Sequence, residues 1–159
     1  MQLRVVRSFA SSWALAVAER RQRLPVVARI QHMGNWKTIS LPDAPPPKGP
    51  YSPAVRAGGF IYVSGQTPRD PVSGTLVGSD VAAQTRQTLS NVERLLAEAG
   101  ASMSDVVSVI IYLTDVGDWE TMNSVYTEFF SAPYPSRTAV GVSLRDILVE
   151  ISAIAFVGP

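Results

Sequence analysis

The sequence contains no cysteine and only one histidine, and these two shortages exclude whole classes of chemistry. Without cysteine there is no thiol nucleophile, no disulfide and no thiolate ligand for zinc. The histidine, His32, lies in a basic N-terminal segment that differs from the rest of the chain, so neither a histidine triad nor a histidine-rich metal site is expected. Any catalysis must come from carboxylates, hydroxyls, arginine or backbone groups.

Long apolar segments are also missing, since no run of residues has the length and character of a membrane span. We therefore expect no membrane partner. The lack of cysteine favours a reducing compartment, with the cytoplasm as the default. The chain of 159 residues is long enough for a single domain with a substantial core.

The net charge of +1 hides an asymmetry between two parts of the chain. Residues 1–34 carry six arginines and one acid, Glu19, whereas residues 35–159 carry eight Lys and Arg against twelve Asp and Glu, a net charge of −4. Binding to a phosphate backbone requires a basic face. Nucleic acid is therefore not expected as a partner of the folded part.

Three interpretations of residues 1–34 stay open: a transit peptide, translation from a misassigned start, or an appendage with its own role. The stretch from Phe9 to Leu24 has helical character and is followed by Pro25, which suits a transit peptide but also arises from arbitrary Arg-rich and Ala-rich coding. A transit peptide would direct the protein to the mitochondrion. The segment is kept apart from the fold prediction.

The pattern of residues 35–159 predicts an α+β domain with a mixed sheet and two helices on one face. The predicted elements are a strand over Phe60–Gln66 after a Gly58-Gly59 turn, a helix capped by Ser79 or Asp80 and ended by Gly100, a strand over Val106–Leu113, a helix capped by Asp118 and running through Phe130, a strand from Arg137, and a last strand over Val149–Val157. The near-continuous apolar run of Val106–Leu113 predicts a central strand covered on both faces.

The segment 43–53 holds five prolines and predicts an extended run over the surface. Its Tyr51 is a candidate wall of a pocket, with simple packing of the segment as the alternative. Further on, Ser64-Gly65 breaks a strand, and a glycine there permits close approach of a ligand or another chain, although an ordinary strand end gives the same pattern.

Arg137 stands at the mouth of a strand just after Pro135, on a face of small residues that includes Ala139 and Gly141. A guanidinium matches a carboxylate in bidentate fashion, and small neighbours leave room for a ligand. Arginines on alternating strands are also commonly solvated, so the pattern alone leaves both possibilities open. Glu150 is the single acid of the last strand, and Asn123 lies beside the apolar stripe of the second helix, either solvated or held by a specific partner.

If both helices cover one face of the sheet, the other face stays open with apolar residues such as Ile154 and Phe156. A half-apolar face of this kind usually pairs with another subunit. The layout therefore predicts an oligomer.

Several motifs occur in a fixed order along residues 35–159: Gly49-Pro50-Tyr51-Ser52, Tyr62-Val63-Ser64-Gly65-Gln66, Asn91-Val92, Asn123-Ser124-Val125-Tyr126, Tyr134-Pro135-Ser136-Arg137 and Val149-Glu150-Ile151-Ser152-Ala153-Ile154-Ala155. Together they resemble the RidA family, also called YjgF, of reactive-intermediate deaminases. The resemblance implies a chorismate-mutase-like α+β fold assembled as a homotrimer, with ligand pockets in the clefts between subunits. It also implies hydrolysis of 2-imino or 2-enamino acids to 2-keto acids and ammonia, protecting pyridoxal-phosphate enzymes, without a metal or organic cofactor.

By the same resemblance, Arg137 matches the arginine that binds the substrate carboxylate, and Glu150 matches the acid near the attacking water. The substrate-binding positions implied are Tyr51, Ser64, Gly65, Asn123 and Ala139. Ala139 stands where many bacterial members carry cysteine, at a position used through its backbone. The connection Ser143–Leu148 lacks the usual Leu-Pro and is shorter than usual, which bears on where Glu150 lies relative to Arg137.

Two functional hypotheses follow. The first is a 2-iminobutanoate/2-iminopropanoate deaminase. The second is a non-catalytic member that binds a small carboxylate such as a 2-keto acid. The presence of both Arg137 and Glu150 favours the enzyme, because a binder needs the arginine but has no evident need for the acid.

Overall fold

The computed structural model describes residues 35–158, in which six strands and two α-helices form an α+β domain. The strands are β1 (Trp36–Ile39), β2 (Ala54–Ala57), β3 (Phe60–Gln66), β4 (Val106–Leu113), β5 (Ser136–Gly141) and β6 (Val149–Phe156); the α-helices are α3 (Val81–Glu98) and α4 (Trp119–Phe129); short 3₁₀ turns cover Met103–Asp105 and Val116–Asp118. The predicted N-terminal extension, residues 1–34, lies outside the described residues.

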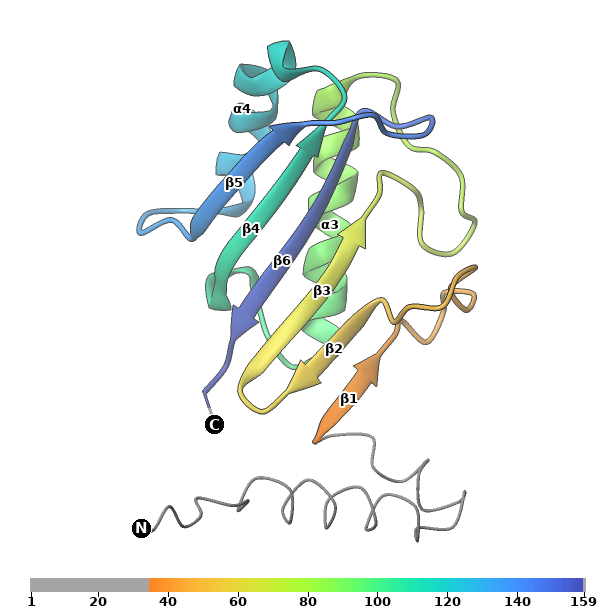
Figure 1. Cartoon of the computed structure of the whole chain (residues 1–159), viewed down its shortest axis with the longest axis vertical. Coiled ribbons are helices and arrows are strands. Elements are labelled where there is room, and N and C mark those ends of the chain that lie inside the picture. The colour runs from red at the N-terminus through yellow and green to blue at the C-terminus, as the bar shows by residue number, and fades with distance from the viewer. Residues whose placement is uncertain (1–34, 159) are drawn as a thin grey trace, which may run out of the picture. The chain divides into compact units, whose positions relative to one another are not determined.

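All six strands belong to one mixed sheet of order β1-β2-β3-β6-β4-β5 (Figure 1). The pairs are antiparallel except β4 with β5, which run parallel because α4 crosses between them. The C-terminal strand β6 is therefore inserted between β3 and β4, and β5 forms one edge of the sheet.

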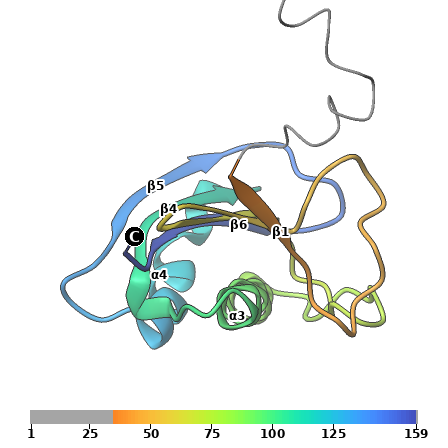
Figure 2. The same ribbon diagram turned by 90° about the horizontal axis from the view of Figure 1, so that it is seen from below.

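Both helices cover the same face of the sheet, as Figure 2 shows. The core lies between them and the sheet, where residues of β3, β4 and β6 that alternate along their strands meet apolar residues of α3 and α4. It includes Ile61, Val63, Val109, Ile111, Leu113, Ile151 and Ala153 from the strands and Leu89, Val92, Leu96, Met122 and Tyr126 from the helices. These features confirm the predicted α+β fold with two helices on one face.

The first helix begins where its cap was predicted. The Asp80 side chain accepts a hydrogen bond from the Ala83 backbone N–H at 2.8 Å, which satisfies one of the free donors at the helix start. Asp118 stands at the N-cap position of α4, but its side chain makes no capping bond, because Asp118 is already the last residue of the preceding 3₁₀ turn. The predicted capping bond at Asp118 is therefore wrong, although the helix is present.

The prediction that β4 is covered on both faces is also wrong for the single chain. Val109, Ile111 and Leu113 are buried beneath the helices, whereas Val107 and Ile110 are exposed on the opposite face. The apolar run thus supplies two apolar faces, of which only one is covered. The uncovered face also carries Tyr62 and Phe156, both exposed.

The sequence pattern missed β1 and β2. These strands have four residues each, with β1 at the edge of the sheet and β2 next to it, and their burial pattern is weak. Between them lie residues 40–53, which we call the proline-rich strap; they include the segment 43–53 that was expected to run extended over the surface. Within residues 35–158, no helix has the length and apolar character required to cross a lipid bilayer.

Candidate active site

Arg137 is the second residue of β5 and projects toward the helix side of the sheet. Its register partner on β4 is Val109, which is buried in the core, and residues directly paired in a sheet share a face. At the sheet edge this direction leads the guanidinium onto α4. There Nη1 of Arg137 donates a hydrogen bond to Oδ1 of Asn123 at 2.7 Å. The mid-helix asparagine is thus held by a specific partner, which was one of its two predicted interpretations.

Two aromatic rings of α4 flank the same guanidinium. Cζ of Arg137 lies 4.7 Å from the centroid of the Tyr126 ring and 5.3 Å from that of Trp119. These distances fall within the range of cation–π attraction. Trp119, Asn123 and Tyr126 follow one another at spacings of four and three residues, so all three project from one face of the helix. We call Trp119 and Tyr126 the aromatic cradle.

Tyr126 is the buried member of the aromatic cradle, with 3% of its surface exposed. Burial raises the pKa of its hydroxyl, and the nearby positive charge of Arg137 partly opposes that rise. The hydroxyl has no hydrogen-bond partner among the described residues. The ring therefore contributes its face to Arg137, while its polar end makes no compensating bond.

A pocket of about 500 Å³ opens beside the guanidinium. Its lining residues come from α4 and from the segment that leads into β5: Asn123, Tyr126, Thr127, Tyr134, Pro135 and Arg137. No acid among residues 35–158 forms an ion pair with Arg137. The guanidinium is therefore fixed by a neutral amide and two rings, with donors left for an anionic ligand.

Ala139 lies two residues beyond Arg137 and on the same face of β5, opposite Ile111 of β4. It packs against the core and is partly buried. Because β5 is an edge strand, its outer backbone groups have no strand partner within the described residues. This edge offers backbone donors and acceptors close to Arg137.

Glu150 lies on the other face of the sheet. Its register partner is Tyr112 of β4, and it alternates with Val149 and Ile151, which are buried on the helix side. A Cβ placed on Gly65 would overlap the Glu150 carboxylate, so the acid rests directly against the glycine. Burial raises the pKa of Glu150. The carboxyl is therefore more easily protonated than an exposed glutamate.

Ser64, the residue before this glycine, is hydrogen-bonded to the proline-rich strap, which also carries Tyr51. The Ser64 hydroxyl donates to the Ser52 carbonyl at 2.7 Å, and the Ser64 backbone N–H donates to the Pro53 carbonyl at 3.0 Å. Two bonds thus fix the strap against the end of β3, and Tyr51, the residue before Ser52, stays largely exposed. Ser64 therefore anchors the strap through its hydrogen bonds, whereas Tyr51 exposes its ring.

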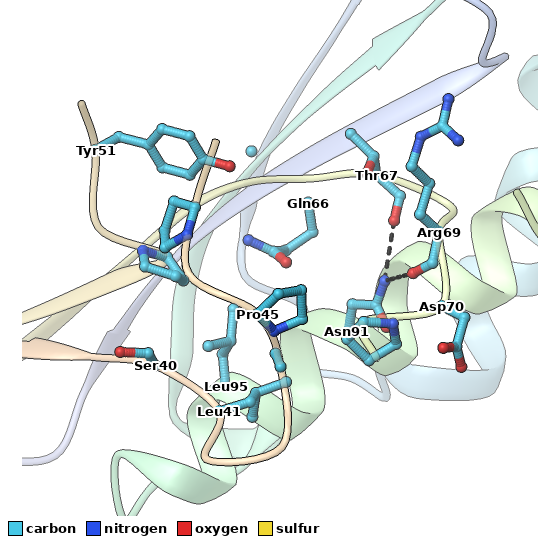
Figure 3. A pocket seen from close by; sticks show the side chains of 15 residues that line it. Ser40, Leu41, Pro45, Tyr51, Gln66, Thr67, Arg69, Asp70, Asn91 and Leu95 are labelled. Atoms are coloured by element: carbon cyan, nitrogen blue, oxygen red, sulfur yellow. Dashed lines mark hydrogen bonds between the residues drawn. The ribbon is translucent and has the colours of Figure 1, made fainter. Parts of the chain in front are cut away.

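A second pocket, of about 190 Å³, is lined by Tyr51 and Gly65 together with Gln66 and parts of the strap and α3 (Figure 3). Its far wall is held by Asn91, whose amide donates to the Thr67 and Arg69 carbonyls at 2.9 and 2.7 Å. The candidate residues therefore form two groups. Arg137, Asn123 and Ala139 lie at the β5 edge, and Tyr51, Ser64, Gly65 and Glu150 lie around the end of β3.

The two groups do not meet within one chain. Arg137 is level with Val109 on β4, whereas Glu150 is level with Tyr112, three residues further along and two strands across from β5. With about 3.3 Å per residue and about 4.8 Å between strands, the two Cα atoms lie roughly 14 Å apart, on opposite faces. No single small substrate can contact both side chains within one chain.

Comparison with known proteins places the chain in a family. The model of the family described as Endoribonuclease L-PSP matches residues 41–157. A RutC family protein of Pyrococcus horikoshii is 46% identical over 76% of this chain and 97% of its own length, and a bovine 2-iminobutanoate/2-iminopropanoate deaminase is 42% identical over 77% and 91%. A crystal structure of Escherichia coli TdcF with bound serine is 38% identical, with a TM-score of 0.70 over 76% of this chain and 98% of that one.

The chain therefore belongs to the Endoribonuclease L-PSP family, which is the RidA or YjgF family that its ordered motifs resemble. Its fold is the chorismate-mutase-like fold of that family. Named deaminases occur among its relatives, while other relatives at similar or higher identity carry only the RutC family name.

The aromatic cradle was not identified as part of the site from the sequence. Trp119 and Tyr126 belong by spacing to the apolar stripe of the second helix, which predicts burial, but Trp119 is more than one third exposed and contacts Arg137. Their spacing from Asn123 on one helix face was a usable signal. That spacing points to the site only once the structure shows that this face of α4 packs against the Arg137 guanidinium.

Proposed function

We propose that this protein hydrolyses 2-imino and 2-enamino acids, such as 2-iminopropanoate and 2-iminobutanoate, to 2-keto acids and ammonia. The observation that carries the proposal is the environment of the Arg137 guanidinium. It is immobilised by Asn123 and the aromatic cradle at an open pocket, and no acid of the described residues neutralises it. Such a group suits a small carboxylate, which its remaining donors can bind in bidentate fashion.

Glu150 is the group that manages protons in this proposal. Water adds to C2 of the imine and forms a C–O bond while the C=N double bond becomes single. Glu150 takes a proton from the water and passes it to the nitrogen, which leaves a hydroxyl and an amino group on C2. A second transfer through Glu150 moves the hydroxyl proton to the nitrogen, so that the C–N bond breaks, ammonia leaves and the C=O bond forms. Burial raises the pKa of the carboxyl above that of an exposed glutamate, which makes it a better proton acceptor for this exchange.

The imine carbon is already electrophilic, so this chemistry asks the protein mainly for orientation. Arg137 would fix the carboxylate end, the β5 edge at Ala139 would face the imine end, and Tyr51 with Gly65 would close the pocket on the side of Glu150. No step of this reaction requires electron transfer or a carrier group. The reaction therefore needs no cofactor.

Because Arg137 and Glu150 lie on opposite faces of one sheet, the proposed site needs two chains. We propose that Arg137 of one subunit and Glu150 of the next line a shared cleft in a homotrimer. The uncovered apolar face supports assembly, since it exposes Tyr62, Val107, Ile110, Val140 and Phe156. A closed ring of three heterologous contacts would supply three such clefts.

The test is ammonia release from 2-aminoacrylate that a cysteine lyase generates in situ, followed for the wild type, Arg137→Ala and Glu150→Gln. The wild type should accelerate release. Arg137→Ala should abolish the acceleration, and Glu150→Gln should reduce it by about 10²- to 10⁴-fold, the usual share of general acid–base catalysis. The oligomeric state of each variant, measured by light scattering, controls for loss of assembly. A wild type without activity would overturn the proposal.

The alternative is a protein that only binds a small carboxylate such as a 2-keto acid. It is favoured by the completeness of the Arg137 half of the site, which holds its guanidinium without help from Glu150. In that case 2-oxobutanoate would raise the melting temperature of the wild type but not of Arg137→Ala, while ammonia release would stay at the background rate.

The remaining expectations concern partners and place in the cell. Residues 35–158 contain no histidine and carry more acid than base, so an RNA-cleaving activity has little support in this part of the chain. The cytoplasm, with the mitochondrion as the alternative, stays a prediction that depends on residues 1–34.

A further inference from the structure

The acid Glu150 is reached through an unusual stretch of backbone. Asp146, four residues earlier, has a φ of 58°, in the left-handed region that non-glycine residues seldom adopt. The chain then enters the core at Ile147 and begins β6 at Val149. A turn of this kind needs an anchor directly after it if the next side chain is to have one fixed position.

The anchor is a set of three hydrogen bonds on Ile147 and Leu148. The Thr114 hydroxyl donates to the Ile147 carbonyl at 2.8 Å, and the Thr114 backbone N–H donates to the Leu148 carbonyl at 3.0 Å. On the opposite side, the Leu148 N–H donates to Oε1 of Gln84 at 2.7 Å. All three bonds lie within three residues of Glu150.

Gln84 accepts the hydrogen bond from the Leu148 N–H that a neighbouring strand would otherwise accept. The last register pair of β3 with β6 joins Gln66 to Ile151, so Leu148 extends beyond the end of β3 and has no strand partner there. Gln84, on the first turn of α3, is 3% exposed and has both ends of its amide engaged, since its Nε2 donates to the Gly78 carbonyl at 3.1 Å. One buried amide thus ties the start of β6 to the loop before α3.

We propose that Gln84 is a positioning residue for Glu150: its amide fixes Leu148, and through it the first residues of β6, so that the Glu150 carboxylate rests against Gly65. The inference deepens the proposed deaminase function and rests on it. Gln84 itself contacts neither Glu150 nor the pocket beside Arg137.

The test compares Gln84→Met with Thr88→Val. Gln84→Met keeps an unbranched side chain of similar size but removes both hydrogen bonds. Thr88 lies one turn further along α3, is fully buried and has no hydrogen-bond partner for its hydroxyl, so Thr88→Val perturbs the same helix without touching the anchor. Gln84→Glu is the conservative variant, because one carboxyl oxygen can still accept from Leu148 and the protonated acid, which burial favours, can donate to the Gly78 carbonyl.

For Gln84→Met we expect kcat for imine hydrolysis to fall about 10- to 100-fold, as small displacements of catalytic groups do, while KM changes less than about twofold because Arg137 is untouched. Thr88→Val should keep the wild-type kcat, and Gln84→Glu should recover most of it. Hydrogen exchange should show faster exchange of the Leu148 amide in Gln84→Met and not in Thr88→Val.

An unchanged kcat in a Gln84→Met protein whose Leu148 amide has lost protection would overturn the inference. Equal losses in kcat for Gln84→Met and Thr88→Val would do the same, since they would report general damage to α3. If Gln84→Met does not fold, Thr114→Val, which removes the hydroxyl bond to Ile147, must show the same division between kcat and KM. If instead Glu150→Gln is fully active, the proposed role of Glu150 fails, whatever Gln84 does.

Discussion

Arg137 and Glu150 project from opposite faces of the same sheet, and the register of β4 with its two neighbours fixes this relationship. Val109 pairs with Arg137 on one side, and Tyr112 pairs with Glu150 on the other. The parity of those positions on β4 is opposite, so the two side chains cannot turn toward one pocket without a shift in register. A site that uses both residues has to be assembled from two chains.

The neutral amide of Asn123 should be essential for leaving the Arg137 guanidinium available to a substrate carboxylate. Asn123→Asp keeps the shape of the side chain but places a carboxylate 2.7 Å from Nη1 of Arg137. The resulting ion pair would compete with the substrate carboxylate, so KM should rise about tenfold or more, equivalent to about 1.4 kcal/mol, with kcat less affected. Steady-state kinetics measures this effect. Thr127→Ser, at another residue of the pocket wall, is the control and should leave KM near the wild-type value.

The aromatic cradle should act through the ring of Tyr126 and not through its hydroxyl. Tyr126→Phe removes a buried hydroxyl that has no partner, so unfolding in denaturant should require the same or slightly more free energy, by up to about 1 kcal/mol, with activity unchanged. Tyr126→Leu removes the ring face and should raise KM roughly 2- to 30-fold, in line with a cation–π contribution of about 0.5–2 kcal/mol. Equal KM values for the two variants would contradict this division of roles.

Gly65 should tolerate no side chain. In Gly65→Ala the new Cβ would overlap the Glu150 carboxylate and push it from its place, so kcat should fall strongly. The glycine lies at an exposed strand end, so the melting temperature should change little. A Gly65→Ala protein with wild-type kcat would mean that the position of Glu150 is unimportant for turnover.

Glu150 should make stability depend on pH in a predictable direction. Burial raises its pKa in the folded chain above the unfolded value, so the charged form is disfavoured by folding. Its contribution to stability is fully present below the unfolded pKa and is lost as the pH rises through the folded pKa. Glu150→Gln should therefore be more stable than the wild type at neutral pH, and the difference should shrink as acid protonates Glu150. Denaturant titrations across this pH range would measure it, and a constant difference would contradict the assignment.

The sequence carried much of the fold because its strongest patterns were long. The helix after Asp80 repeats its apolar residues over five turns, and β6 alternates buried and half-exposed positions from Val149 to Phe156. The short strands β1 and β2 were missed because four residues with little burial give no period. The uncovered face of β4 was misjudged because an apolar run does not indicate whether its second face is covered within the same chain.

The candidate site, like the fold, was predictable from the sequence only in part. The face shared by Arg137 and Ala139 follows from strand alternation alone. For Asn123 the pattern left two possibilities, solvation or a specific partner, and the structure shows the second. The roles given to individual residues came from the family motifs. What no local pattern contained was the pairing of Val109 and Tyr112 with different neighbours, which separates Arg137 from Glu150, and the reach of Gln84 to Leu148 across 64 positions of sequence.

The most direct measurement mixes two inactive variants, Arg137→Ala and Glu150→Gln, by joint refolding, and follows imine hydrolysis. If each pocket takes Arg137 from one subunit and Glu150 from the next, random assembly gives about one quarter of the pockets both native residues, and about a quarter of wild-type activity should return. The same variants combined without refolding provide the background. Activity that does not rise above this background would contradict a site shared between subunits.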